Sequence, residues 1–209
     1  MFQHHVGFSR YVTYVAVLLL AACATKSQQI APQATGGLTD VRTQAVALKQ
    51  QLSRTTDAAR KVSQSSATDL KNSLEILSSS LNSLNSTLAQ GSYKVAVAQQ
   101  EVRKYFDQWA QETNSMPSDL QQTSQERQAQ AAVSFKSLRG SIDNVRTNTW
   151  PFINDMNAVA DYLRTDQTQA GVDAVSPRIS KTLDAEPVIQ RDLDQVIAQI
   201  DAIQNTNKK

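Results

Sequence analysis

Residues 70–109 read LKNSLEILSSSLNSLNSTLAQGSYKVAVAQQEVRKYFDQW, and this stretch decides the fold. Its apolar residues recur in steps of four and three for nearly six heptads, with Gly91 at one position of the repeat. A strict seven-residue repeat is typical of helices that pack together with a left-handed supercoil. The pattern therefore predicts a helix over residues 68–113, about 70 Å long, that packs along most of its length.

Weaker helical periodicity flanks this stretch on both sides. It predicts a first helix over residues 38–62, a third over 118–163 and a fourth over 172–203. The turn at Met116-Pro117 ends the second helix, because proline cannot continue the hydrogen-bond ladder. The fold class is therefore all-α: an elongated antiparallel bundle of three to four long helices with coiled-coil-like packing.

Several details of this bundle follow from single residues. Residues 63–68 (SQSSAT) predict a tight turn, with one continuous helix as the alternative. Pro151 predicts a kink in the third helix, and Pro187 bends or divides the fourth. Antiparallel pairing across the Met116-Pro117 turn places Ile142 opposite Gly91, where the missing side chain makes room.

The composition favours helices and argues against some fold classes and partners. Among 209 residues there are only 6 Gly, 5 Pro, 2 His and 1 Cys, and the formal net charge is +2. Low Gly and Pro contents argue against β-sandwich and Rossmann-type folds. The near-neutral charge gives no reason to expect nucleic acid as a partner.

The first 23 residues resemble a bacterial lipoprotein signal. Arg10 precedes an apolar stretch of 12 residues, Tyr11 to Ala22, which is too short to span a bilayer. The stretch ends in Leu20-Ala21-Ala22-Cys23, which resembles the lipobox whose cysteine is acylated. An ordinary signal peptide followed by a chance cysteine is the alternative. We expect a signal peptide at 1–22 and lipid attachment at Cys23.

This reading defines the mature chain and its location. By resemblance to Gram-negative sorting, Ala24 after the cysteine implies an outer-membrane lipoprotein that faces the periplasm of the bacterial envelope. Residues 23–37 are interpreted as the lipidated Cys and a flexible tether, closed by Gly36-Gly37, and residues 38–209 as the helical bundle domain. Both histidines, His4 and His5, leave with the signal peptide.

The mature chain offers little for catalysis or for metal and cofactor binding. Nucleophilic catalysis usually needs a histidine base, and zinc or iron sites need Cys or His ligands. The isolated glycines do not form a phosphate-binding loop. The acidic residues Asp184, Glu186, Asp192 and Asp194 are interpreted as a solvated helix face. We therefore expect no enzyme activity, no catalytic residues, no cofactor and no metal.

Two features could carry an interaction instead. Trp150 lies off the predicted seam and is the candidate interaction residue, whereas Tyr105 and Trp109 lie on the seam and are expected in the core. Residues 78–92 (SSSLNSLNSTLAQGS) carry no charge, which is unusual for an exposed helix. Either packing against the bundle compensates, or this face meets another helix.

The stretch from Phe106 to Ile203 resembles an uncharacterised bacterial family, domain of unknown function 2959. The residues that carry the resemblance are Phe106-Asp107-Gln108-Trp109, Ser124-Gln125-Glu126-Arg127, Phe135, Leu138, Trp150-Pro151-Phe152 and Asp192-Leu193-Asp194-Gln195-Val196-Ile197. Tyr162-Leu163 departs from the family's usual Lys-His-Asn-Leu. The resemblance implies a helical envelope protein and no known activity.

The sequence thus predicts a non-catalytic, lipid-anchored envelope protein that acts as a structural or protein-interaction module. Its partners are the membrane, through the lipid on Cys23, and an envelope protein of unknown identity; a homo-oligomer stays open. The alternative is a lipoprotein that binds or carries an apolar ligand within its helical bundle. A continuous apolar cavity would favour the alternative, and a tightly packed seam would oppose it.

Overall fold

A computed structural model describes residues 27–206 of the chain, and the surroundings of side chains from Ala34 to Asn205. These residues form five helices and no strand. The helices are α2 (Ser27–Ser63), α3 (Leu70–Asn114), α4 (Ser118–Thr165), α5 (Gln169–Leu183) and α6 (Glu186–Thr206). The all-α bundle is confirmed, and the predicted fourth helix is divided into α5 and α6.

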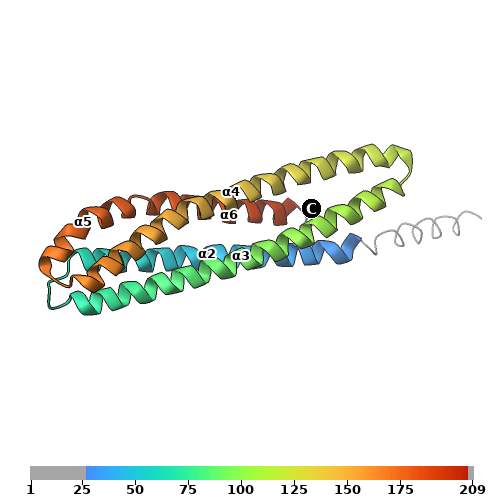
Figure 1. The fold of residues 1–209 in the computed structure, drawn as a ribbon. Helices are drawn as coiled ribbons and strands as arrows, with labels where there is room; N and C mark the ends of the chain where they lie inside the picture. Colours follow the sequence, from blue (N-terminus) through green and yellow to red (C-terminus); the bar gives the residue numbers. More distant parts are fainter. Residues whose placement is uncertain (1–26, 207–209) are drawn as a thin grey trace, which may run out of the picture.

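The helices lie side by side in an elongated bundle (Figure 1). α2 runs antiparallel to α3, and α4 returns along α3 after the turn at Met116-Pro117. α5 and α6 together run back along α4 and α2. The turns α2–α3 and α4–α5 lie at one end, whereas the α3–α4 turn lies alone at the other, beyond the last residues of α6.

The predicted seam of α3 is the core of the bundle in its first half. Six leucines of the repeat are buried, and four of them are no more than 1% exposed. They are Leu70, Leu74, Leu77, Leu81, Leu84 and Leu88. Beyond Gly91 only Ala98 is a buried seam position, and Val95, Val102, Tyr105 and Trp109 are half-buried. The seam loses cover because α3 and α4 extend past α6.

The predicted flexible tether is wrong from Ser27 onward. α2 is continuous through Gly36-Gly37, and both Ala34 and Leu38 are buried. A Cβ atom on Gly37 would lie 3.1 Å from the Cα of Ala98 and 2.2 Å from Oε2 of Glu101. Gly37 therefore serves the close approach of α2 to α3, and not chain flexibility. The bundle domain begins before residue 38, and residues 24–26 lie outside the described part.

The turn between α2 and α3 is confirmed. Its backbone is held by a hydrogen bond from the amide of Leu70 to the carbonyl of Ser66, at 3.0 Å. The hydroxyl of Ser66 donates to Oδ2 of Asp69 at 2.7 Å, and the Asp69 side chain makes no cap hydrogen bond to α3. The alternative of one continuous helix is therefore excluded.

The prolines act differently along the chain. Pro151 lies inside α4, which continues as a helix on both sides of it. Pro177 lies within α5, because that helix already begins at Gln169. Pro187 is the second residue of α6, where a missing amide hydrogen costs no helical bond. The division into α5 and α6 therefore falls where the sequence places Pro187.

The acidic residues of the last helices are not a simply solvated face, as the sequence suggested. Asp192 is 6% exposed and accepts a hydrogen bond from the Asn148 amide at 2.7 Å. Asp194 pairs with Lys49, and Glu186 pairs with Arg60 at 3.0 Å. These three residues connect α6 to α4 and α2, whereas both Asp184 and Asp194 keep the predicted exposure.

We predict opposite effects of alanine at the two adjacent glycines of α2. Gly36→Ala should stabilise the fold by about 0.5–1 kcal/mol, because nothing lies within 4 Å of the new methyl group and alanine favours helix. Gly37→Ala should destabilise it by about 1 kcal/mol, because α2 and α3 must move apart. Urea unfolding followed by circular dichroism checks both, and equal effects would contradict this packing.

A second pair of variants tests the leucine seam. Leu77→Ala should lower the free energy of unfolding by about 2–5 kcal/mol, because Leu77 is 0% exposed. The neighbouring Ile76→Ala should stay within about 0.5 kcal/mol of the unaltered protein, because Ile76 is 42% exposed. A small decrease in the free energy of unfolding for Leu77→Ala would show that the seam leucines do not form the stabilising core.

Candidate interaction groove between α3 and α4

α3 and α4 enclose a groove made of two adjoining hollows. The first lies toward the α2–α3 turn and is called the neutral hollow, because its lining residues on α3 from Ser78 to Thr87 carry no charge. It is lined by Lys71, Leu74, Glu75, Ser78, Ser79, Asn82, Ser83, Ser86, Thr87, Arg164 and Gln167, of which Lys71, Glu75 and Arg164 are charged. The second, the apolar hollow, lies in the middle of the bundle. Thr87 lines both, so the two hollows adjoin at this residue of α3.

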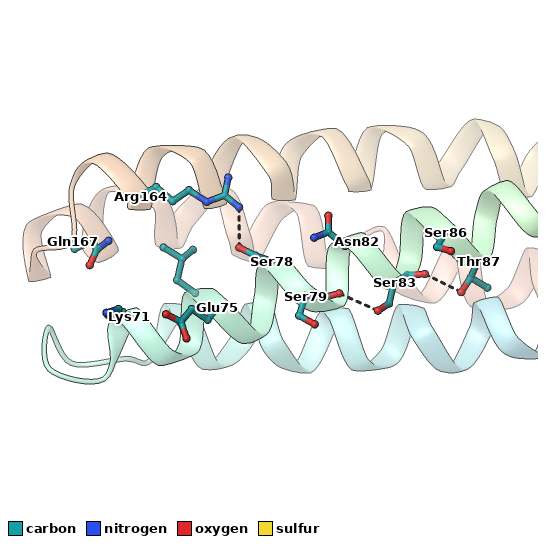
Figure 2. A pocket seen from close by; sticks show the side chains of 11 residues that line it. Lys71, Glu75, Ser78, Ser79, Asn82, Ser83, Ser86, Thr87, Arg164 and Gln167 are labelled. Carbon is teal, nitrogen blue, oxygen red and sulfur yellow. Dashed lines mark hydrogen bonds between the residues drawn. The ribbon is translucent and has the colours of Figure 1, made fainter.

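The neutral hollow is rich in small hydroxyl and amide side chains. Its volume is about 850 Å³, and Figure 2 shows Asn82 and Arg164 reaching toward the space between the two helices. Nη2 of Arg164 donates to the Ser78 hydroxyl at 3.0 Å and so bridges α4 to α3. Ser83 and Thr87 donate to carbonyls one turn earlier on α3, at 3.0 Å and 2.9 Å. Their oxygens keep lone pairs that can accept hydrogen bonds from a bound partner.

The α3 wall of the neutral hollow is formed in part by the uncharged segment 78–92. Its polar side chains are not packed against the bundle: Ser79, Asn82, Ser83 and Ser86 are exposed. From residue 76 to residue 93, α3 carries no charged side chain, and Glu75 and Lys94 flank this stretch. The exposed face of α3 therefore has no ion pairs of its own to stabilise it, and it lines the groove.

The apolar hollow lies where all four long segments of the bundle meet. Its volume is about 310 Å³, within the range of small-molecule pockets. Buried side chains from α2, α3, α4 and α6 form its walls, namely Val41, Ala45, Leu48, Leu88, Val145, Leu193 and Val196. Arg139, Asp143 and Arg146 of α4 line the same hollow and are exposed, so its margin is charged.

The predicted pairing of Gly91 with Ile142 is wrong in detail. Both residues line the apolar hollow, but the neighbour of a Cβ atom added at Gly91 is the Cβ of Gln44 on α2, at 3.8 Å. Ile142 does not come within 4 Å of that position. The missing side chain therefore leaves space in the hollow, and it is not filled by the β-branched residue opposite.

The end of the α3–α4 hairpin carries the aromatic cluster Tyr105, Phe106, Trp109 and Phe135. Phe106 lies edge-on to Phe135, with ring centroids 5.6 Å apart across the hairpin. Nε1 of Trp109 donates to the Ser124 hydroxyl at 2.9 Å, in the register that the turn predicts. Burial raises the pKa of the Tyr105 phenol. The core role expected for Tyr105 and Trp109 is met only in part, because all four rings are half-buried.

The remaining predicted site residues lie outside the groove. Trp150 is 46% exposed on α4, as its off-seam position indicated, but it lines neither hollow. Its neighbours Thr149 and Phe152 are buried. Cys23 and the signal peptide lie outside the described residues. The sequence missed the groove itself, although the charge-free stretch of α3 was a signal of it.

Ion pairs fasten α6 to α2. Nε of Arg42 donates to Oδ1 of Asp201 at 2.7 Å. This hydrogen bond lowers the pKa of the Asp201 carboxyl and raises that of the Arg42 guanidinium. Both side chains are more than one third exposed, so the pair orients the helices and contributes little to stability.

Within residues 27–206, no helix is long and apolar enough to cross a bilayer. The same residues contain no group of three His, Cys, Asp or Glu side chains placed to hold a metal ion. Comparisons of the chain with protein-family models, curated proteins and solved structures give no match. The resemblance to domain of unknown function 2959 stays a prediction.

Proposed function

We propose that this chain is a non-catalytic, lipid-anchored envelope protein that acts as a protein-interaction module. The observation that supports the proposal most directly is the neutral hollow, an exposed groove whose α3 wall has no charge between Glu75 and Lys94. The lipobox-like Leu20-Ala21-Ala22-Cys23 supports the anchor.

The chemistry of the groove favours a helical or extended protein segment as its partner. Small side chains such as Ser79 and Ser83 allow the backbone of a partner to approach α3 closely. Their oxygens accept hydrogen bonds, while Arg164 and Gln167 offer donors from the opposite side. Lys71 and Glu75 line the hollow at one end of the neutral stretch, and charged residues are common at the rim of an interface.

A charge placed in the groove should disrupt this interaction. In cells treated with a chemical cross-linker, Ser86→Lys should lower recovery of the partner at least about tenfold, because an unpaired charge is costly to bury at an interface. Ser134→Lys is the matched control, because Ser134 is exposed on α4 outside both hollows. Equal recovery with both variants would exclude the groove as the interaction surface.

The anchor is tested in the same experiment by Cys23→Ser. This variant should move the protein to the soluble fraction, since the lipid chains supply the membrane affinity. A specific partner that is lost with Cys23→Ser identifies a membrane-tethered adaptor. If the Cys23→Ser variant stays in the membrane fraction, that result contradicts the lipid anchor.

The apolar hollow supports the alternative, a lipoprotein that binds or carries an apolar ligand. Its walls combine buried Leu88, Val145 and Leu193, and its charged margin could orient a polar headgroup. Gly91→Leu should then lower the amount of apolar ligand that mass spectrometry detects in solvent extracts of the purified protein. Gly91→Ala is the control, because its methyl group meets only Gln44 at an ordinary distance. Absence of any extracted ligand from the unaltered protein would reject this alternative.

A further inference from the structure

The start of α2 lies at the same end of the bundle as the α3–α4 turn (Figure 1). Two contacts fix the register of these antiparallel helices: Gly37 lies against Ala98, and Asp40 pairs with Lys94 at 2.7 Å. Ten residues before Gly37, Ser27 is therefore level with about residue 108 of α3. At 1.5 Å per residue, the hairpin reaches about 10 Å beyond the start of α2.

The chain between Ser27 and Cys23 is short. Four residues span at most about 14 Å even when fully extended. This length is close to the distance by which the hairpin extends beyond Ser27. A lipid on Cys23 would thus hold the membrane surface near the level of the Met116-Pro117 turn, because no long tether separates the anchor from the bundle.

The end of the hairpin combines few charges with an exposed apolar residue, and it lies at the end of the bundle that the anchor would hold near the membrane. Residues 113–122 carry a single charge, on Asp119, and Leu120 is 53% exposed. The aromatic cluster lies directly behind, and aromatic rings with a polar group suit the boundary between lipid and water. By contrast, ion pairs such as Arg42–Asp201 and Arg60–Glu186 line the side formed by α2 and α6.

We propose that the end of the α3–α4 hairpin, residues 113–122, rests on the headgroup layer of the membrane, and that the bundle stands upright on it. The proposal rests on the proposed lipid anchor at Cys23. Its occupant is a neutral phospholipid surface, since the hairpin end has no basic residue to recognise anionic lipid. The consequence is that the groove lies at a fixed distance from the membrane. Ser83 in the neutral hollow lies about 50 Å from the hairpin turn along α3.

The orientation can be measured with one thiol at each end of the bundle. In the acylated protein the sulfur of Cys23 is already bonded, so Leu120→Cys or Ile76→Cys provides a single free thiol for an environment-sensitive fluorophore. Both positions are exposed apolar residues on helices, which makes them a matched pair. The full lipidated protein is placed in phosphatidylcholine vesicles with brominated acyl chains, which quench only fluorophores near the lipid.

We expect the label at position 120 to be quenched at least twofold more than the label at position 76. Equal quenching of both labels, or of neither, on vesicle-bound protein would overturn the upright orientation while leaving the anchor intact. If the emission of the label at position 120 shifts with protein concentration in the absence of lipid, the hairpin end contacts a second copy of the chain. That result would overturn the membrane contact. Protein that does not float with the vesicles would overturn both the anchor and this proposal.

Discussion

The packing of the α3 leucine seam against α2 is the constraint on which the rest of the structure depends. Leu52 of α2 and Leu70, Leu77 and Leu84 of α3 are fully buried, and each such side chain contributes about 1.5–3 kcal/mol. α2 stays beside α3 from the turn at 64–69 to its own start near the hairpin. This pair therefore fixes the length of the bundle, the end at which the chain enters it, and the face of α3 that stays open.

The helices and most of their boundaries were predictable because their causes are local. A seven-residue repeat marks the buried stripe of α3, and Pro117 and Pro187 mark helix boundaries without reference to the rest of the chain. The start of α2 was not predictable in this way. Gly36-Gly37 has the composition of a flexible linker, and only the contact of Gly37 with Ala98, far along the chain, shows that glycine there serves helix packing.

The groove was also not predictable from the sequence. The repeat predicts which residues of α3 face inward, but it does not predict the angle at which α4 crosses them. Residues such as Ser79 and Asn82 flank the seam, so whether they are covered depends on where α4 lies. The sequence showed that this face is uncharged and left two explanations open. The structure leaves part of this face exposed beside a buried seam, and that exposure results from packing contacts made by all the helices together.

The neutral face of α3 is a local weakness that the seam offsets. Serine and asparagine each favour helix less than alanine by about 0.5 kcal/mol, and the stretch from residue 76 to residue 93 has no ion pair of its own to compensate. The same helix buries a leucine at almost every seam position over this stretch, which exceeds that cost. A helix stabilised on one face can leave its other face free of charge. Under the proposed function, such an open face can accept another molecule without excluding it by charge.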